Sequence, residues 1–355
     1  MTRTHASRTR RTLTSPLLLV WLAVLAVEST LAAAAPGDPA LIPSIFRPES
    51  TPAHSIHELS MLVLAITGII FAVVFGLIVY ALVRYRRRPD DDGGEPAQVY
   101  GSTQVEIAWT VTPVLIVVVL SLTGARAIDR IQNTPRPAAS LDVTAVGHQW
   151  WWEFRYPSLG IVTANELHVP VSDPANPTPT FLKLLSADVV HSFWVPRLAG
   201  KMDLIPNRVN EMWIAPEKPG LYLGQCAEYC GTQHAKMLLR VYVHARDDFD
   251  RWAGEQRQAG AQSQNVAEGR RIFETTSCIS CHAVGGTVGT GTFGPDLTHL
   301  MSRETLGSGA APNTPENLRT WIESPEHAKP GSLMPAMNLT RRELDELVAY
   351  LETLR

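Results

Sequence analysis

The stretch Cys226-Ala-Glu-Tyr-Cys-Gly-Thr-Gln-His-Ala-Lys-Met237 gathers four soft or borderline metal donors within twelve residues. These donors are Cys226, Cys230, His234 and Met237. Thiolate, imidazole and thioether ligands together favour copper over hard cations such as magnesium or calcium. A single blue-copper site uses one cysteine, two histidines and a weak methionine. Because the cysteine is doubled here, the pattern predicts two metals bridged by two thiolates.

A second histidine ligand has to come from elsewhere in the chain. The best candidate is His191, in the segment Asp188-Val-Val-His-Ser-Phe-Trp-Val-Pro196. Two other interpretations compete with copper. A disulfide between Cys226 and Cys230 would suit an extracytoplasmic segment, and zinc is also bound by cysteine and histidine. Methionine is a poor zinc ligand, and the surrounding donors favour copper over a simple disulfide.

Composition sets broad limits on the class of protein. The chain has 355 residues, enough for two or more domains, and its formal net charge of −3 does not suggest nucleic-acid binding. Apolar residues reach 45% and concentrate in three runs near the N-terminus, which indicates a membrane protein with soluble parts. The four cysteines fall in the copper stretch and in Cys278-Ile-Ser-Cys-His282, which leaves none for a structural disulfide.

Residues 1–35 are expected to be a bacterial secretory signal peptide. Four arginines precede a short apolar run, and the small residues Ala32–Ala35 follow it. An uncleaved first membrane helix is the alternative. The run is short for a membrane span and is interrupted by Glu28, so cleavage is favoured.

Residues 36–130 are expected to form a transmembrane hairpin. Its two spans are predicted at about residues 59–83 and 106–126, where the chain is apolar over a length that crosses a bilayer. A basic cluster, Arg84-Tyr-Arg-Arg-Arg88, follows the first span and should stay in the cytoplasm. Everything after about Arg126 is then expected on the periplasmic face of a bacterial cytoplasmic membrane.

Residues 139–246 are expected to be all-β. Short runs with strand patterning are separated by breaks rich in proline and glycine, and the clearest of these runs are residues 141–146, 181–185, 209–214 and 238–243. Many short strands with turn signals predict a sandwich or a Greek-key barrel. The copper stretch would lie just before the last strand, where a rigid sheet holds its ligands in place.

The segment Cys278-Ile-Ser-Cys-His282 has the spacing of a c-type haem attachment site. The two thiols of such a site form thioethers to the haem vinyl groups, and the adjacent histidine binds the iron. A chance match and a redox disulfide are the alternatives. The extracytoplasmic context, the preceding amphipathic helix and the length of chain that follows favour haem.

The second axial ligand of this haem is expected to be a methionine, which raises the reduction potential. Lys329-Pro-Gly-Ser-Leu-Met-Pro335 resembles the distal loop of small bacterial cytochromes c, so Met334 is the favoured ligand and Met337 its rival. Phe293-Gly-Pro-Asp-Leu297 resembles the loop of that family whose proline carbonyl accepts the N–H of the proximal histidine, and Pro295 matches this proline.

Residues 265–355 therefore resemble an all-α class I cytochrome c domain. Residues 247–264 are polar and are expected to be a helical tail that fades into a linker between this domain and the β region. Thr314-Pro-Glu is expected to start a helix, with proline at the first position. Thr340-Arg-Arg-Glu343 is a capping box. The apolar residues after it fall on one helical face, as expected of a terminal helix that packs against a core.

The copper stretch and the His191 segment closely resemble the binuclear copper (CuA) site of cytochrome c oxidase subunit II. The ligands of that family correspond here to His191, Cys226, Cys230, His234, Met237 and the backbone carbonyl of Glu228. The resemblance implies a cupredoxin fold for residues 139–246. It also implies that the Glu228 carboxylate helps to bind magnesium at the interface with the catalytic subunit, with a solvated loop glutamate as the alternative.

Gly147-His-Gln-Trp-Trp-Trp-Glu-Phe154 resembles the aromatic region beside the copper site in that family. The first tryptophan of the family segment is the surface residue through which electrons enter, and Trp150 matches it. Core packing is the alternative for such aromatic residues, and at least one of the three is expected to do only that. His148 is expected to be structural.

Val105-Glu-Ile-Ala-Trp109 resembles the subunit II segment whose glutamate lies at the entrance of a proton path into the catalytic subunit. This resemblance makes Glu106 a candidate for proton uptake. An ionisable group at membrane depth is costly and points to a function by default. The alternative is an interfacial glutamate that simply reaches water.

Nearly the whole mature chain resembles subunit II of a haem–copper cytochrome c oxidase with a fused cytochrome c domain, the caa-type arrangement. The resemblance implies that a soluble cytochrome c or a quinol–cytochrome c reductase reduces haem c. The electron would then pass to CuA and on to subunit I, which reduces oxygen to water and pumps protons. Subunits I and III are the implied partners, and a fused donor needs only a weak docking surface.

Two other classes of function fit parts of the sequence. A membrane-tethered copper assembly or storage factor would bind one labile Cu(I) and would need neither the His191 strand nor the haem. A CuA domain could also serve nitrous or nitric oxide reduction. The two spans and the Val105–Trp109 segment disfavour the nitrous oxide version.

Overall fold

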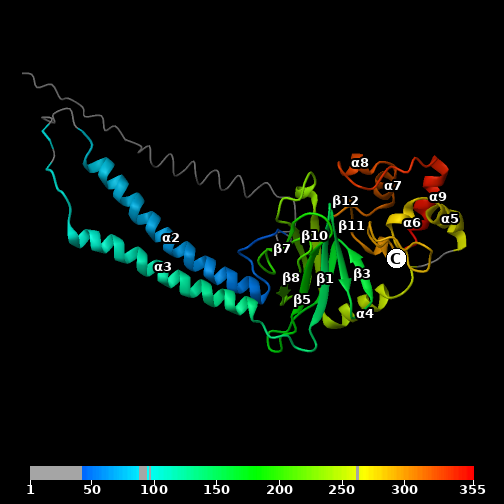
Figure 1. Cartoon of the computed structure of the whole chain (residues 1–355), viewed down its shortest axis with the longest axis horizontal. Coiled ribbons are helices and arrows are strands. Elements are labelled where there is room, and N and C mark those ends of the chain that lie inside the picture. The colour runs from blue at the N-terminus through cyan, green and yellow to red at the C-terminus, as the bar shows by residue number, and fades with distance from the viewer. Residues whose placement is uncertain (1–41, 88–93, 96, 261–263) are drawn as a thin grey trace, which may run out of the picture. The chain divides into compact units, whose positions relative to one another are not determined.

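The computed structural model describes residues 42–87, 94–95, 97–260 and 264–355 (Figure 1). The expected signal peptide, residues 1–35, lies outside the described residues. Residues Pro43–Arg355 form one compact unit.

Two long helices, α2 (Thr51–Arg84) and α3 (Thr103–Gln132), form the expected hairpin and run side by side (Figure 1). Their most apolar 18-residue windows have mean hydropathies of 3.0 and 2.2. No residue of α3 is buried, and in α2 only Pro52 and Ala53 are. Helices that are apolar on all sides suit a bilayer. Both exceed the predicted spans because polar turns extend each helix beyond its apolar centre.

The N-terminal end of α2 and the C-terminal end of α3 are hydrogen-bonded to the β region. The Ser50 hydroxyl, just before α2, accepts a hydrogen bond from the Ala215 N–H at 2.9 Å. The Trp213 indole N–H donates to the carbonyl of Ile131, near the end of α3, at 2.6 Å. The C-terminal end of α2 and the N-terminal end of α3 therefore lie at the end of the hairpin far from the β region (Figure 1).

Residues 141–244 form two five-stranded sheets. The first has the order β3-β2-β1-β5-β8 and the second the order β4-β10-β9-β6-β7. The strands are β1 (Leu141–His148), β2 (Trp151–Tyr156), β3 (Ile161–Ala164), β4 (Glu166–Pro170), β5 (Thr180–Ser186), β6 (His191–Trp194), β7 (Met202–Leu204), β8 (Asn210–Ile214), β9 (Gly220–Cys226) and β10 (Leu238–His244). Only the β1–β5 and β4–β10 pairs are parallel among these strands. The prediction of a cupredoxin-like β domain is confirmed.

The core of this domain lies between the two sheets. Alternation places Leu182 and Leu184 of β5 inside, fully buried, while Lys183 between them is exposed. Trp152 and Phe154 of β2 are also fully buried. Each large side chain of this kind contributes about 1.5–3 kcal/mol through removal of apolar surface from water. This packing holds the strand ends that carry the site.

The segment 247–264 is expected to be a helical tail that fades into a linker, and its first part is helical. Residues Arg246–Gln256 form helix α4, and Phe249 and Ala253 on one of its faces are buried. The Trp252 ring packs against Tyr156 of the β core, with 5.4 Å between ring centroids. These three residues recur at helical spacing, so one face of α4 packs on the β domain.

The C-terminal region is helical, as predicted. It contains η3 (Gln264–Val266), α5 (Ala267–Thr275), α6 (Cys278–Cys281), η4 (Leu300–Ser302), α7 (Pro315–Glu323), α8 (Pro325–Ala328) and α9 (Arg341–Leu351). A two-stranded ribbon of β11 (Thr305–Leu306) and β12 (Ala311–Pro312) is an addition that the sequence did not indicate. The Thr340–Glu343 capping box is present at the start of α9. In α7, the Thr314 hydroxyl accepts the Asn317 N–H.

Several hydrogen bonds join this region to the β domain. The Leu238 N–H of β10 donates to the Ser308 carbonyl in the ribbon turn at 3.2 Å. The Ser308 hydroxyl donates back to the Leu238 carbonyl at 2.5 Å. The buried carboxylate of Glu166 accepts the Glu304 N–H at 2.8 Å. These contacts bring the helical region against the sheet that carries the copper stretch.

We predict that Gly269→Ala destabilises the helical region, because α5 and α9 cross at this glycine. An added Cβ would lie 2.0 Å from the Glu346 carbonyl oxygen, a clash that typically costs about 1–3 kcal/mol or more. Hydrogen exchange of α5 and α9 amides in the full chain should therefore accelerate. The control is Gly254→Ala in α4, where a Cβ meets nothing within 4 Å. Wild-type exchange in Gly269→Ala would contradict the close packing.

Candidate functional site

The copper stretch connects β9 to β10 through a loop that contains the short helix η2 (His234–Lys236). The antiparallel β9–β10 pair closes at the loop, where the Cys226 N–H donates to the Met237 carbonyl at 2.9 Å. His191 opens β6, which pairs with β9 through Phe193 and Cys226. Sheet pairing therefore delivers the distant His191 to the loop, as the sequence predicted.

The six predicted copper donors lie together. The Cys226 and Cys230 Sγ atoms are 3.8 Å apart, and Cys226 Sγ lies 4.0 Å from His191 Nδ1 and 3.2 Å from the Glu228 carbonyl oxygen. Cys230 Sγ lies 3.7 Å from His234 Nδ1 and 3.9 Å from Met237 Sδ. Both thiols are free, and their separation is far longer than a disulfide bond. The structure therefore does not contain the alternative disulfide.

The two thiols influence each other's ionisation. The pKa of Cys226 is lowered, chiefly because the Cys230 thiol donates a hydrogen bond to its thiolate. The pKa of Cys230 is raised, because its own ionisation would lose that bond and place a second negative charge beside the first. A bound cation removes this conflict, since thiolate is the form that binds metal.

The imidazole of His191 is oriented by Asp188. The Asp188 carboxylate accepts a hydrogen bond from His191 Nε2 at 2.8 Å, which directs Nδ1 toward Cys226. The same carboxylate accepts the backbone N–H groups of Gln149 and Val189. Burial lowers the pKa of His191, but the hydrogen bonds and charges of Asp188 and Cys226 together outweigh it, and the net shift of the pKa is upward. We did not expect this role from the sequence, although the spacing of three residues is a usable signal.

Little water can reach four of these donors, whereas His234 is half-buried. His191 and Met237 are fully buried, and both cysteines are 3% exposed. A Cβ on Gly147 would lie 2.8 Å from the His191 ring, so this position needs glycine. A dry, closely spaced set of thiolate, imidazole and thioether donors fits copper better than a hard cation.

The three consecutive tryptophans point to different places. Trp152 is buried in the β core, which is the packing role expected of at least one of them. Trp150 donates its indole N–H to the carbonyl of Cys230 at 3.0 Å. Trp151 stacks on His148, with 4.1 Å between centroids. Trp150 therefore touches the copper loop directly, whereas Trp151 faces a second site.

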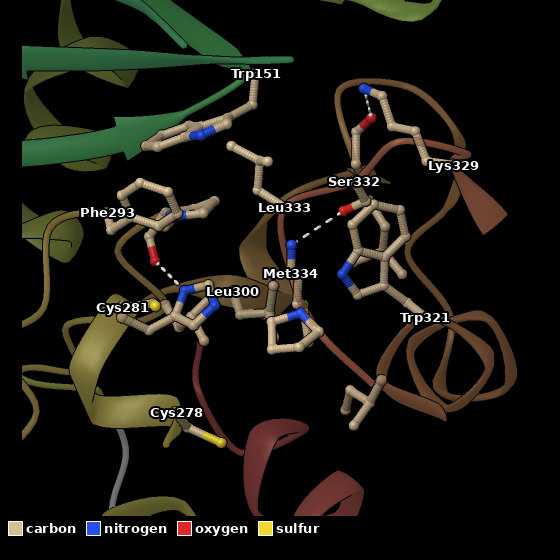
Figure 2. Close-up of a pocket in the computed structure, with 18 of the residues that line it drawn as sticks. Trp151, Cys278, Cys281, Phe293, Leu300, Trp321, Lys329, Ser332, Leu333 and Met334 are labelled. Atoms are coloured by element: carbon tan, nitrogen blue, oxygen red, sulfur yellow. Dashed lines mark hydrogen bonds between the residues drawn. The ribbon is translucent and has the colours of Figure 1, made fainter. Parts of the chain in front are cut away.

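That second site is a cavity of about 260 Å³ around the Cys278–His282 segment (Figure 2). Figure 2 shows Cys278 and Cys281 on their helix, with Trp151 entering from a strand of the β domain. Much of the remaining lining is apolar and includes Leu300, Leu318, Trp321, Ile322, Leu347 and Leu351. A mostly apolar pocket with two thiols and an imidazole on one wall fits a covalently attached haem.

The imidazole of His282 is held in one orientation. Its Nδ1–H donates to the Pro295 carbonyl at 2.7 Å, the contact expected from the sequence. Burial lowers the pKa of His282 and favours the neutral ring, which leaves Nε2 free to bind metal. A Cβ on Gly294 would lie 2.6 Å from the His282 ring, so the loop can approach this closely only at glycine.

Met334 and Met337 both line the cavity. Met334 packs against the hydrophobic core of the helical region, and Met301 packs there too without lining the cavity. Arg303 was missed by sequence reasoning. It is buried at the cavity wall, and its Nε has no hydrogen-bond partner among the described residues. An anionic substituent on a bound group would supply one.

The side chains of two predicted residues, Glu228 and Glu106, lie outside the copper donors and the cavity. Glu228 points an exposed side chain away from the buried thiols, although its carbonyl faces Cys226. Glu106 is exposed in the first turn of α3. Within the described residues, the only group of at least three His, Cys, Asp or Glu donors close enough to share a metal is His191, Cys226 and Cys230.

Comparison with known families divides the chain into three matches. Residues 42–125 match the transmembrane domain of cytochrome c oxidase subunit II, and residues 174–243 match its periplasmic domain. Residues 266–355 match the cytochrome c family. The segment that contains the three tryptophans lies outside all three matches.

Whole-chain relatives carry the same description. The chain is 36% identical to cytochrome c oxidase subunit 2 of Alkalihalophilus pseudofirmus, over 87% of this chain and 90% of that protein. It is 30% identical to cytochrome c oxidase subunit 2 of Bacillus subtilis, over 85% and 88%. A solved periplasmic domain of cytochrome oxidase subunit II from Bradyrhizobium japonicum is 31% identical, with a TM-score of 0.32, over 34% of this chain and 96% of that one.

We predict that Asp188→Asn weakens copper binding about 10- to 100-fold, because the His191 ring loses its charged acceptor. A competition titration of the full chain against a chelator measures this. Asp248→Asn, an exposed carboxylate on α4, is the matched control. Wild-type affinity in Asp188→Asn would show that this carboxylate does not support the ligand.

We predict that Met334→Leu abolishes the reduced low-spin spectrum of a methionine-ligated haem, because leucine has no sulfur to bind iron. Met337→Leu is the matched control and should keep that spectrum. Optical spectra of the haem-loaded full chain distinguish them. The reverse pattern would assign the ligand to Met337.

Proposed function

The chain belongs to the cytochrome c oxidase subunit II family, in the form with a C-terminal cytochrome c domain, and we propose that it is the electron-accepting subunit of a proton-pumping oxidase. Its relatives are subunits of an oxidoreductase complex. One observation carries the proposal: six copper donors and a Cys-X-X-Cys-His cavity lie in one chain, joined by hydrogen bonds. The assembly-factor alternative would need neither His191 nor the cavity.

The copper donors fit a binuclear CuA centre. Cys226 and Cys230 would bridge two ions, with His191 and His234 as imidazole ligands and Met237 as the weak thioether. The Glu228 carbonyl would complete the set. When bound, CuA and haem c supply one-electron redox chemistry between a soluble cytochrome c or quinol–cytochrome c reductase and the haem–copper subunit I, which reduces oxygen.

Different residues would attach the haem, bind its iron and orient the iron ligand. Cys278 and Cys281 would attach the haem covalently, and His282 would bind its iron through Nε2. Pro295 fixes the ring of His282 through the Nδ1–H bond, which sets the tautomer. Met334, which lines the same cavity, would supply the second protein ligand of the iron.

Trp150 is proposed as the residue through which electrons enter the copper site. Its indole N–H is hydrogen-bonded to the carbonyl of Cys230, a proposed copper ligand. On its other side, a Cβ on Gly331 of the loop before Met334 would lie 3.3 Å from the Trp150 ring. The ring thus lies between the loop that carries Met334 and the copper loop.

The proposed topology follows from the hairpin. The N-terminal end of α2 and the C-terminal end of α3 are hydrogen-bonded to the β domain. Arg84, Arg86 and Arg87 lie at the opposite end of α2. Since basic loops stay in the cytoplasm, the β and cytochrome domains would face the periplasm of a bacterial inner membrane. Subunits I and III would pack against the apolar faces of α2 and α3.

Glu106 in the hairpin and Glu228 in the copper loop are both proposed to face subunit I. Glu106 lies in the first turn of α3, and the other end of this helix contacts the β domain through Ile131. Glu106 therefore lies at the cytoplasmic end, where proton uptake would begin. The exposed Glu228 carboxylate would help to bind Mg²⁺ at the interface with subunit I.

We propose domain boundaries that differ from the sequence prediction at one point. The transmembrane hairpin would occupy residues 36–130, and the CuA domain residues 139–256, because α4 packs on its core. A shorter linker at 257–264 would lead to the cytochrome c domain at 265–355. The signal peptide stays a prediction at residues 1–35.

We predict that the full chain, matured with haem and copper in detergent, contains two coppers and one haem. The two coppers should share one unpaired electron in the electron paramagnetic resonance spectrum, because Cys226 and Cys230 lie close enough together to hold both ions in one centre. Cys226→Ser should lose this signal and keep the haem. One copper with an ordinary mononuclear signal, or no copper, would overturn the proposed CuA centre.

A further inference from the structure

Lys329 has an unusual environment for a lysine. It lies in the loop between α8 and Met334, and it is only 3% exposed. Figure 2 shows it at the edge of the cavity, on the same loop as Leu333 and Met334. A buried ammonium group is costly unless hydrogen bonds replace its water. Its partners therefore indicate what the residue does.

Three backbone carbonyl groups accept hydrogen bonds from the Lys329 amine. Nζ lies 2.7 Å from the Trp150 oxygen, 3.0 Å from the Lys236 oxygen and 2.8 Å from the Gly307 oxygen. An ammonium group has three N–H donors, so these bonds use all of them. The acceptors come from three separate segments, two in the β domain and one in the cytochrome region.

Each β-domain acceptor belongs to the copper site or its border. Lys236 lies between the proposed copper ligands His234 and Met237. Trp150 donates its indole N–H to the carbonyl of Cys230, a third proposed ligand. The Lys329 amine is therefore hydrogen-bonded directly to the backbone of the copper loop at Lys236. It is also bonded to the backbone of Trp150, whose indole N–H contacts the same loop.

A second bond joins the same two loops. The Gln233 side chain donates to the carbonyl of Pro330, next to Lys329, at 2.6 Å. Gln233 precedes the proposed copper ligand His234 and is buried. Adjacent residues of the cytochrome loop thus contact both ends of the short copper-loop segment from Gln233 to Lys236.

We propose that Lys329 is a positioning residue that fixes the haem-ligand loop against the copper loop, and thereby sets the spacing of the two redox centres. This inference rests on the proposed function, since it needs both centres to be present. The amine acts through Trp150, Lys236 and Gly307 and touches neither cofactor. A side chain with the same stem and no donor should keep both sites and lose their alignment.

The test compares Lys329→Met with wild type and with Lys201→Met, an exposed lysine of the β domain. Copper content, haem content and both spectra should be unchanged in the full chain. The Leu238 and Glu304 amides, which bond across the contact, should exchange about tenfold faster in Lys329→Met. Electron transfer from haem to copper after flash reduction should slow by about tenfold or more, because even a small displacement of the two centres relative to each other slows the reaction.

The outcomes separate the inference from the proposed function. Wild-type exchange in Lys329→Met overturns the positioning role, and so does faster exchange with an unchanged transfer rate, which marks a purely structural bond. If Lys329→Met does not accumulate, Lys329→Gln keeps an amide donor and should show the same changes to a smaller degree. Wild-type protein that lacks two coppers or the haem refutes the proposed function instead, while hydrogen exchange still reports on the contact.

Discussion

The β9–β10 pair is the constraint on which both sites depend. Its register brings Cys226 and Met237 together at 2.9 Å between backbone N–H and carbonyl, and this closes the loop that carries the other donors. The sheet on either side is packed and dry, so the soft donors have few alternative positions. The same strand, β10, bonds to the cytochrome ribbon through Leu238 and Ser308. One strand pair therefore supports the copper loop and the surface on which the cytochrome region rests.

The candidate metal donors could be nominated from the sequence because their chemistry is local and unusual. Two cysteines, a histidine and a methionine within one short stretch have few explanations, and a Cys-X-X-Cys-His segment has fewer. Helix ends were also predictable where a cap is coded locally, as at Thr340 and Glu343. The family resemblance extended this reading to His191, which sequence spacing alone could only nominate.

The residues that support the donors were harder to predict, since their role depends on contacts between distant segments. Asp188 orients His191 and also binds the Gln149 backbone, far away in sequence. Arg303 belongs to no sequence motif, and its burial leaves its Nε without a partner among the described residues. In both cases the decisive quantity is a tertiary contact rather than a local sequence pattern.

The contact at Lys329 can fix the orientation of the β and cytochrome domains, which the linker between them does not. Linking two domains raises their effective concentration to about the millimolar range, but a linker selects no orientation. Three hydrogen bonds from a charged donor contribute about 1.5–3 kcal/mol each, while burial of the ammonium costs several kcal/mol. Removal of the Lys329 amine breaks all three bonds at once, so Lys329 stabilises the contact by a modest net amount. Its three carbonyl partners are satisfied together in only one arrangement of the loops, and orientation is what the amine supplies.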